Sequence, residues 1–208
     1  MPNAYTVVES FERAIADYTG APFAVATESC SSALFLCMKY LGALRRDEIT
    51  IPTRTYVSVA AQVVHAGGRI RFENIDWQHK GFYQLAPLPL YDSAKRLTRN
   101  MWKDTEMNGN LACISFHGRK PLKIGRGGMI LCRTQEEVEW FECARFDGRH
   151  KVPQLQDKFA FAGWNMYMTP EQAARGMEIM QWHGEGSIIE PEEYPPLDGY
   201  EFFTEANR

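Results

Sequence analysis

Apolar residues recur along this chain with two periods, one typical of helices and one typical of strands. The helical period predicts helices over about 7–18, 31–41, 56–66, 135–145 and 169–181. Short apolar runs between turn residues predict strands over 23–27, 49–51, 69–72, 88–91, 111–116 and 129–132. Such alternation is typical of a mostly parallel sheet with helices on both faces. We therefore expect a three-layer α/β/α fold.

Composition narrows the class of protein. With 45% hydrophobic residues among 208, the chain can bury a core, and its net charge of −3 gives no electrostatic case for binding nucleic acid. The first dozen residues include Glu9 and Glu12, so we expect no signal peptide, and no stretch is apolar enough to span a membrane. The five cysteines lack C-x-x-C spacing, and the histidines are scattered. These features favour a cytoplasmic protein with reduced thiols and no metal site.

The segment SFHGRKPLKIGRGG, at 115–128, carries the most informative chemistry. An apolar strand ends near Ser115, and a turn then presents Lys120 beside a glycine-rich bend. A desolvated lysine near other cations loses its proton more easily and can attack a carbonyl group. The alternative is a surface lysine in a basic loop, because three further basic residues are close by.

Three other segments place polar or aromatic side chains directly after predicted strands. In AVATESCSSAL, Cys30 and Ser31 begin a helix, where free N–H groups and the helix dipole favour phosphate; plain capping by Ser29 is the alternative. In ITIPTRTYVS, Tyr56 opens a helix, although a lone aromatic there is usually part of the core. In LPLYDSAK, a strand delivers Asp92 to its carboxyl end, where ligands of α/β sheets gather, unless Asp92 caps a helix.

A fourth segment, GWNMYMTPEQAA at 163–174, matches less closely. Thr169 and Pro170 are typical of the first positions of a helix. They do not account for Asn165, which precedes them.

Taken in order, these segments resemble the DegT/DnrJ/StrS sugar aminotransferase family over most of residues 6–182. The resemblance implies the aspartate-aminotransferase fold and the cofactor pyridoxal phosphate (PLP). It also implies a role for each matching residue: a Schiff base on Lys120, pairing with the pyridine nitrogen by Asp92, ring stacking by Tyr56, phosphate binding by Cys30, Ser31 and Ser115, and phosphate contact across a dimer interface by Asn165.

The chain departs from the family pattern in several places. Lys95 stands where the family has glutamine or histidine near the ring oxygen, so it is either a second active-site amine or points to solvent. Cys30 replaces a glycine. Between Asp76 and Asp92 one βα unit is missing. After residue 182 the small domain is largely missing, and an acidic tail with prolines and aromatic residues, 183–208, follows the PLP-binding domain at 1–182. We expect this tail to lie on the body or on a partner subunit.

The resemblance implies a PLP-dependent aminotransferase that uses an amino donor and a small keto or keto-sugar substrate. Lys120 and Asp92 would be its catalytic residues, and the protein would be a homodimer. Other PLP chemistry, as in a decarboxylase, lyase or dehydratase, needs the same cofactor residues and stays open. So does a non-catalytic scaffold that keeps the fold. A generic nucleotide-binding domain is disfavoured because G-x-G-x-x-G does not follow the first strand.

Overall fold

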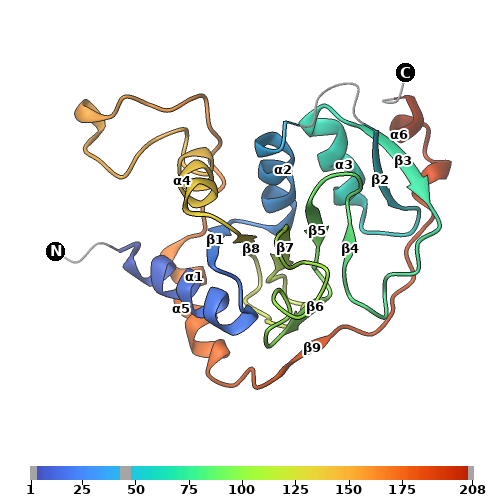
Figure 1. Ribbon diagram of the computed structural model, residues 1–208, viewed down its shortest axis with the longest axis horizontal. Helices are drawn as coiled ribbons and strands as arrows, with labels where there is room; N and C mark the ends of the chain where they lie inside the picture. Colours follow the sequence, from blue (N-terminus) through green and yellow to red (C-terminus); the bar gives the residue numbers. More distant parts are fainter. Residues whose placement is uncertain (1–3, 43–47, 206–208) are drawn as a thin grey trace.

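The computed structural model describes residues 4–42 and 48–205, and Figure 1 shows the arrangement of their elements. All the predicted helices and strands are present, with ends shifted by no more than two residues. The helices are α1 Thr6–Thr19, α2 Cys30–Tyr40, α3 Val57–Ala66, α4 Gln135–Ala144, α5 Pro170–Met180 and α6 Glu201–Glu205. The strands are β1 Phe23–Thr27, β2 Glu48–Pro52, β3 Arg69–Glu73, β4 Tyr83–Gln84, β5 Leu90–Asp92, β6 Arg96–Thr98, β7 Leu111–Ser115, β8 Gly128–Cys132 and β9 Gly186–Ile188. Short 3₁₀ turns cover Gln154–Gln156 and Leu197–Gly199.

The central sheet has the strand order β1-β8-β7-β5-β4 and is mixed. Strand β7 pairs with β5 in parallel, whereas the β1–β8, β7–β8 and β4–β5 pairs are antiparallel. The expectation of a mostly parallel sheet is therefore wrong for this sheet. Parallel neighbours need a long crossover, usually through a helix. The chain between β7 and β8 contains no helix, so β8 returns beside β7 in the opposite direction.

The three-layer arrangement is confirmed by how the strands divide their side chains. Val25, Cys113 and Ile130 pack with α2, α3 and α4 in one buried cluster. Ala26 and Ile114 alternate with them along the same strands and pack with α1 and α5 in a second cluster. Figure 1 shows these two groups of helices on opposite faces of the sheet. Successive side chains of a strand point to opposite faces, so an apolar strand can serve two layers.

Capping side chains fix where the helices begin. Ser29 accepts a hydrogen bond from the Ser32 N–H at the start of α2. Thr169 and Gln172 form a reciprocal capping box at the start of α5, and Pro170 takes its first position, as the sequence predicts. The beginning of α2 is also where β8 approaches. A Cβ atom on Gly128 would lie 2.4 Å from the Ser29 carbonyl carbon, so only glycine fits there.

The stretch between β3 and β5 is short and contains no helix, in line with the predicted loss of a βα unit. Strand β4 pairs with β5, and the Thr50 N–H of β2 donates to the Ala86 carbonyl at 2.7 Å. Residues 83–86 therefore connect the central sheet to the separate parallel pair of β2 and β3.

The C-terminal segment lies on the body of the same chain. Strand β9 pairs with β6, and the chain then runs along the molecule towards α6, as the red part of Figure 1 shows. Leu197 and Phe203 of this segment are buried in the cluster that includes α2 and α3. Its contacts therefore join it to the core.

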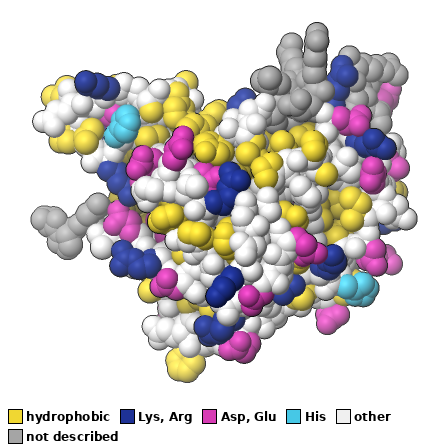
Figure 2. Space-filling model, in the orientation of Figure 1, with side chains coloured by type: hydrophobic (Ala, Val, Ile, Leu, Met, Phe, Trp, Pro, Cys, Tyr) yellow, Lys and Arg dark blue, Asp and Glu magenta, His cyan; other side chains and the backbone are white. Residues whose placement is uncertain are grey.

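The loop between α4 and α5 stands away from the rest of the molecule, at the upper left of Figure 1. Val152, Leu155 and Phe159 are exposed apolar side chains of this loop, and Figure 2 shows hydrophobic side chains on the projecting lobe. Among the described helices, none is long and apolar enough to cross a membrane.

Candidate active site

A cavity of about 460 Å³ lies where the start of α2, the end of β5, the start of α3 and the β7–β8 loop meet. The C-terminal segment adds one residue to it. The lining consists of Ser29, Cys30, Ser31, Leu34, Tyr56, Ser58, Val59, Asp92, Ala94, Ser115, His117, Arg119, Lys120, Gly125, Arg126, Gly127 and Tyr194. Six of the eight predicted site residues are in this set, and they come from four distant segments of the chain.

Lys120 lies in the turn that follows β7. The Lys120 N–H donates to the His117 carbonyl at 2.8 Å, and the Gly125 N–H donates to the Phe116 carbonyl at 3.0 Å, so both sides of the loop are held by backbone hydrogen bonds. Gly125 has φ of +116°, a conformation that favours glycine. The lysine is half-buried and faces a cavity, which distinguishes it from a lysine on an open basic surface.

Asp92 supplies a buried carboxylate to the cavity wall. Its Oδ2 accepts a hydrogen bond from the Tyr83 hydroxyl at 3.0 Å, and its Oδ1 accepts one from the Ala94 N–H at 2.9 Å. The Tyr83 hydroxyl also lies 2.7 Å from the Thr55 Oγ1. Burial raises the pKa of Asp92, while these two hydrogen bonds and the nearby charge of Lys120 act in the opposite direction.

The alternative role of Asp92 as a helix cap is wrong. Strand β6 follows it after a short turn, with no helix between them. The bond to Ala94 stabilises that turn and leaves the carboxylate facing the cavity.

The start of α2 brings small polar groups to the opposite side of the cavity. The Ser31 hydroxyl lies 2.8 Å from that of Ser58 on α3, so the starts of two helices are joined at the lining. Ser29 caps α2, so the capping interpretation is correct for this residue. It does not conflict with the predicted phosphate-binding role, which concerns the neighbouring Cys30 and Ser31. Burial raises the pKa of Cys30 well above its usual value, which keeps this thiol protonated. A neutral thiol and two hydroxyls beside a helix N-terminus suit an anion.

Tyr56 immediately precedes α3, and its side chain is 55% exposed. That exposure excludes the core interpretation of this aromatic residue. Because the ring lies at the cavity instead, its face is available to a flat ligand.

Lys95 and Asn165 do not line the cavity. The Lys95 side chain is only 1% exposed, so the expectation that it points to solvent is wrong. Its Nζ donates to the Gln78 Oε1 at 3.0 Å and to the Glu190 carbonyl at 2.6 Å. Segments distant in sequence thus draw Lys95 away from the lining, and its role as a cofactor ligand has no support from this geometry.

Asn165 lies at the base of the projecting loop, where its Nδ2 donates to the Asp147 Oδ2 at 3.2 Å. The side chain is exposed and therefore accessible to a second subunit. The role implied for it across a dimer interface stays a prediction.

Several lining or supporting residues escaped the sequence analysis. Tyr83 and Thr55 orient Asp92, Ser58 pairs with Ser31, and Tyr194 comes from the C-terminal segment. A hydroxyl three residues after Pro52, as in Thr55, was visible in the sequence. Tyr83 and Tyr194 gave no local signal, because their positions depend on how distant segments dock.

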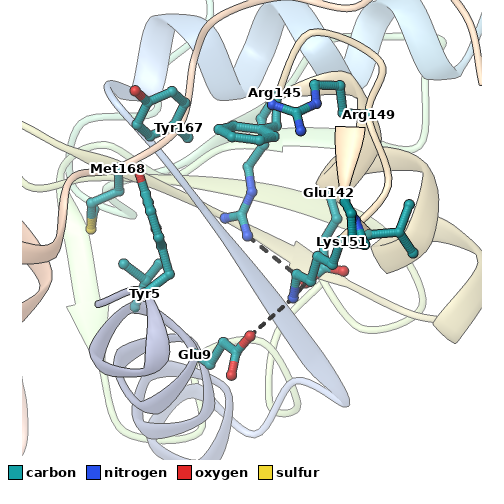
Figure 3. A pocket seen from close by; sticks show the side chains of 12 residues that line it. Tyr5, Glu9, Glu142, Arg145, Arg149, Lys151, Tyr167 and Met168 are labelled. Atoms are coloured by element: carbon teal, nitrogen blue, oxygen red, sulfur yellow. Dashed lines mark hydrogen bonds and ion pairs between the residues drawn. The ribbon is translucent and has the colours of Figure 1, made fainter. Parts of the chain in front are cut away.

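A second cavity, of about 310 Å³, lies between α1, α4 and the start of the projecting loop, and it shares no lining residue with the first. Figure 3 shows Lys151 between two carboxylates there. Its Nζ lies 3.1 Å from the Glu9 Oε1 and 2.7 Å from the Glu142 Oε1. Arg145 pairs with Glu12 of α1 below it. These charges are paired with each other, so the cavity has the features of a helix-packing junction.

Several solved structures share this fold. A sugar aminotransferase from Streptococcus pneumoniae, solved in PLP and PMP forms, matches with a TM-score of 0.69 in both, at 16% and 15% identity, over 85% of this chain and 59% of that one. A structure of 3-amino-5-hydroxybenzoic acid synthase matches with a TM-score of 0.70 and 18% identity, over 84% of this chain and 55% of that one. At these identities the likeness establishes the fold.

Curated proteins from other organisms are similar to this chain in sequence. The spore coat polysaccharide biosynthesis protein SpsC of Bacillus subtilis is 39% identical over 77% of this chain and 48% of its own length. The GDP-perosamine synthase of Caulobacter vibrioides is 26% identical over 84% of this chain and 56% of its own. The chain thus spans about half the length of the curated relatives it matches.

The family profile matches residues 2–82 and 98–183 and omits 83–97, the stretch that holds β4, β5 and Asp92. The omission coincides with the shortened connection between β3 and β5. The matched residues make up most of the chain and include Lys120, Tyr56 and the start of α2. The chain belongs to the DegT/DnrJ/EryC1/StrS aminotransferase family.

Proposed function

We propose that this protein is a PLP-dependent aminotransferase that acts on a small keto or keto-sugar substrate. One observation carries the proposal: Lys120, Asp92, Tyr56, Ser115 and the start of α2 converge on one cavity. These residues belong to segments that are far apart in the sequence. Membership of an aminotransferase family supports the same reaction class.

The groups of the cavity fit pyridoxal phosphate. Asp92 is a buried carboxylate on an open cavity wall, and a protonated ring nitrogen would compensate its charge. The start of α2 with Ser31 would hold the phosphate, and the face of Tyr56 would cover the ring. When bound, the cofactor supplies an electron sink for bond cleavage at the carbon that bears the amino group.

The chain's own residues would divide the remaining work. Lys120 would hold the cofactor covalently and would carry a proton to and from the substrate carbon. Tyr83 and Thr55 fix the orientation of the Asp92 carboxylate, so its charge stays directed into the cavity.

The test is chemical trapping followed by a donor reaction. Borohydride treatment of the PLP-loaded protein and peptide mass mapping should place the pyridoxyl group on Lys120; labelling confined to Lys95 or Lys123 would refute that assignment. Glutamate or another amino donor, added alone, should then convert bound PLP to PMP and release a keto acid. Release of carbon dioxide or ammonia without PMP would favour a decarboxylase or lyase. A protein with no PLP absorbance band would favour the scaffold alternative.

The position of Lys95 gives no support to the alternative of other PLP chemistry. A second amine in the active site would favour that alternative slightly. In the structure the Lys95 Nζ binds Gln78 and the C-terminal segment instead.

We further infer a homodimer with the cofactor site near the subunit interface. The exposed Asn165 and the apolar side chains on the projecting loop support it. Sedimentation should give a dimer, and a monomer that binds PLP fully would contradict the inference.

The five cysteines are all free, which supports a reducing compartment such as the cytoplasm.

A further inference from the structure

The cavity has a wall that the sequence resemblance does not account for. Tyr194 lines the cavity beside Asp92 and Lys120, although it lies beyond the residues that the family profile matches. It belongs to the stretch 189–197, which follows β9 and crosses the body between two fixed ends.

Backbone hydrogen bonds hold both ends of this stretch. The Ile189 N–H donates to the Lys95 carbonyl at 2.8 Å, and the Leu197 N–H donates to the Thr53 carbonyl at 2.9 Å. Between them, the Arg54 guanidinium donates to the Tyr194 carbonyl at 2.6 Å. The segment is thus tied to the turns that follow β5 and β2.

Gln78 holds the middle of the segment with both atoms of its amide. Its Oε1 accepts from the Glu192 N–H at 2.7 Å, and its Nε2 donates to the Glu192 carbonyl at 2.8 Å. This is the pairing that a neighbouring strand would make. It fixes the backbone of Glu192, and hence the direction of the side chains on either side.

Glu192 joins the segment to two basic residues near the cavity. Its carboxylate lies 3.6 Å from the Lys95 Nζ and 3.9 Å from a guanidinium nitrogen of Arg119, which is a lining residue. Burial lowers the pKa of Lys95, and the nearby Glu192 carboxylate acts in the opposite direction. Glu192 thus gives this enclosed lysine a partner of opposite charge.

The Tyr194 ring is held on two sides. Its hydroxyl donates to the Glu192 Oε2 at 2.8 Å, and its ring stacks on Trp77 with centroids 6.3 Å apart and planes 24° from parallel. The ring orientation is therefore set before any ligand binds. A rigid aromatic wall restricts which ligands can enter a cavity. Because the ring is already ordered, ligand binding does not require a large loss of its conformational entropy.

We propose that residues 189–197 form a wall of the PLP cavity, with Tyr194 as the side chain that faces the cofactor and substrate and Glu192 as the residue that positions it. This inference rests on the proposed function for the identity of the ligand. It assigns a role in the site to a segment outside the matched family region.

The main test is PLP affinity, measured by absorbance titration. Tyr194→Ala should weaken PLP binding about tenfold, in the range of a lost aromatic contact. Tyr194→Phe keeps the ring but loses the hydrogen bond to Glu192, so it should weaken PLP binding less than Tyr194→Ala does. Tyr200→Ala is the matched control, since Tyr200 is an exposed aromatic residue three positions after this stretch and does not line the cavity. Equal affinity for wild type, Tyr194→Ala and Tyr200→Ala would overturn the proposal.

Hydrogen exchange supplies the second measurement and needs no ligand. The amides of Ile189, Glu192 and Leu197 should exchange slowly in the wild type, and Glu192→Gln should speed their exchange because Lys95 loses its carboxylate. Free exchange in the wild type would overturn the proposal. A wild-type protein that binds no PLP would refute the proposed function. In that case slow exchange of these amides would still support residues 189–197 as a wall of the cavity, and fast exchange would refute that role as well.

A kinetic measurement separates the wall from the chemistry. In an active enzyme, Tyr194→Ala should raise KM for the keto substrate more than it lowers kcat, because the ring contacts ground state and transition state alike. A fall in kcat with unchanged KM would contradict this role for Tyr194.

Discussion

Lys120 and Lys95 lie in two neighbouring regions of the molecule. One region leaves its amine accessible from a cavity, and the other encloses it. The β7–β8 loop leaves Lys120 half-buried at an open cavity, where its charge offsets part of the rise that burial causes in the pKa of Asp92. The β5–β6 turn places Lys95 under the C-terminal segment, where its Nζ contacts Gln78, Glu190 and Glu192. An amine that must react has to be reachable, whereas an amine that joins segments has to be enclosed. The comparison teaches that residue type and proximity to a site do not establish a role in its chemistry.

The largest expected effect separates the two lysines by activity. Lys120→Ala should lower the rate of PMP formation from an amino donor by about 10²–10⁴-fold, the usual contribution of a positioned proton carrier, or more if cofactor attachment is also lost. Lys95→Met should retain the donor reaction, because Lys95 lies outside the lining. Single-turnover absorbance changes would measure both variants. A comparable loss in Lys95→Met would place that amine in the chemistry after all.

The second effect concerns the carboxylate that Lys120 faces. Burial raises the pKa of Asp92, so the folded protein binds this proton more tightly than the unfolded chain does. Stability of the cofactor-free protein therefore falls as pH rises from the unfolded pKa to the folded one, and Asp92→Asn removes that penalty. The variant should lose most turnover, yet melt higher than wild type at about pH 7 without PLP, with a smaller difference near pH 4.

Thermal melts of both proteins across pH, with and without PLP, would check this prediction. Bound PLP should reverse the order, because the protonated ring nitrogen compensates the charge of Asp92. Unchanged turnover in Asp92→Asn would show that the carboxylate serves only the turn at Ala94.

The third effect compares the two partners of the buried ion pair. Glu192→Gln leaves the Lys95 ammonium, only 1% exposed, without its carboxylate, and should cost about 1–3 kcal/mol of unfolding free energy. Lys95→Met removes the buried charge itself and leaves Glu192, which is 33% exposed, in contact with water, so it should cost less. Urea unfolding would measure the difference. The reverse order would mean that the enclosed amine relies on Gln78 and Glu190 alone.

The smallest expected effect concerns a helix cap outside the two lysine regions, and it serves as a stability reference for the other variants. Thr169→Ala removes the capping box of α5 and should cost about 1 kcal/mol with little change in PLP affinity. The same urea experiment would report it. A strong loss of PLP affinity in Thr169→Ala would mean that destabilisation alone disturbs the cavity, and the other variants would then need correction for it.

Much of the fold could be predicted because its signals are local. The apolar period, the Thr169-Pro170 start of α5 and the glycine-rich bend before β8 each involve residues close together in sequence. The direction of β8 was missed, since strand polarity depends on whether a connection folds back directly or crosses over through a helix. Strands β4, β6 and β9 were missed because two or three residues carry no period.

The site residues likewise divide into those that could be predicted from local sequence and those that could not. Lys120, Asp92, Tyr56 and Ser31 could be selected because each follows a strand or opens a helix in a recognisable segment, and the sheet brings those segments to one cavity. Tyr83 could not be selected, because its contact with Asp92 requires residues 83–86 to lie beside β5. The place of Lys95 could not be predicted either, because the sequence does not reveal that Glu190 and Glu192, nearly a hundred positions later, enclose it.

The sequence by itself determined the longer helices and strands, the family and the side chains that the sheet edge presents, because backbone propensity and strand-to-helix junctions are properties of neighbouring residues. The tertiary structure alone decided which lysine is enclosed, which hydroxyls orient Asp92 and that Tyr194 completes the lining. Burial sets the cost of a charge and the direction of a pKa shift, and burial depends on every segment that packs against a group.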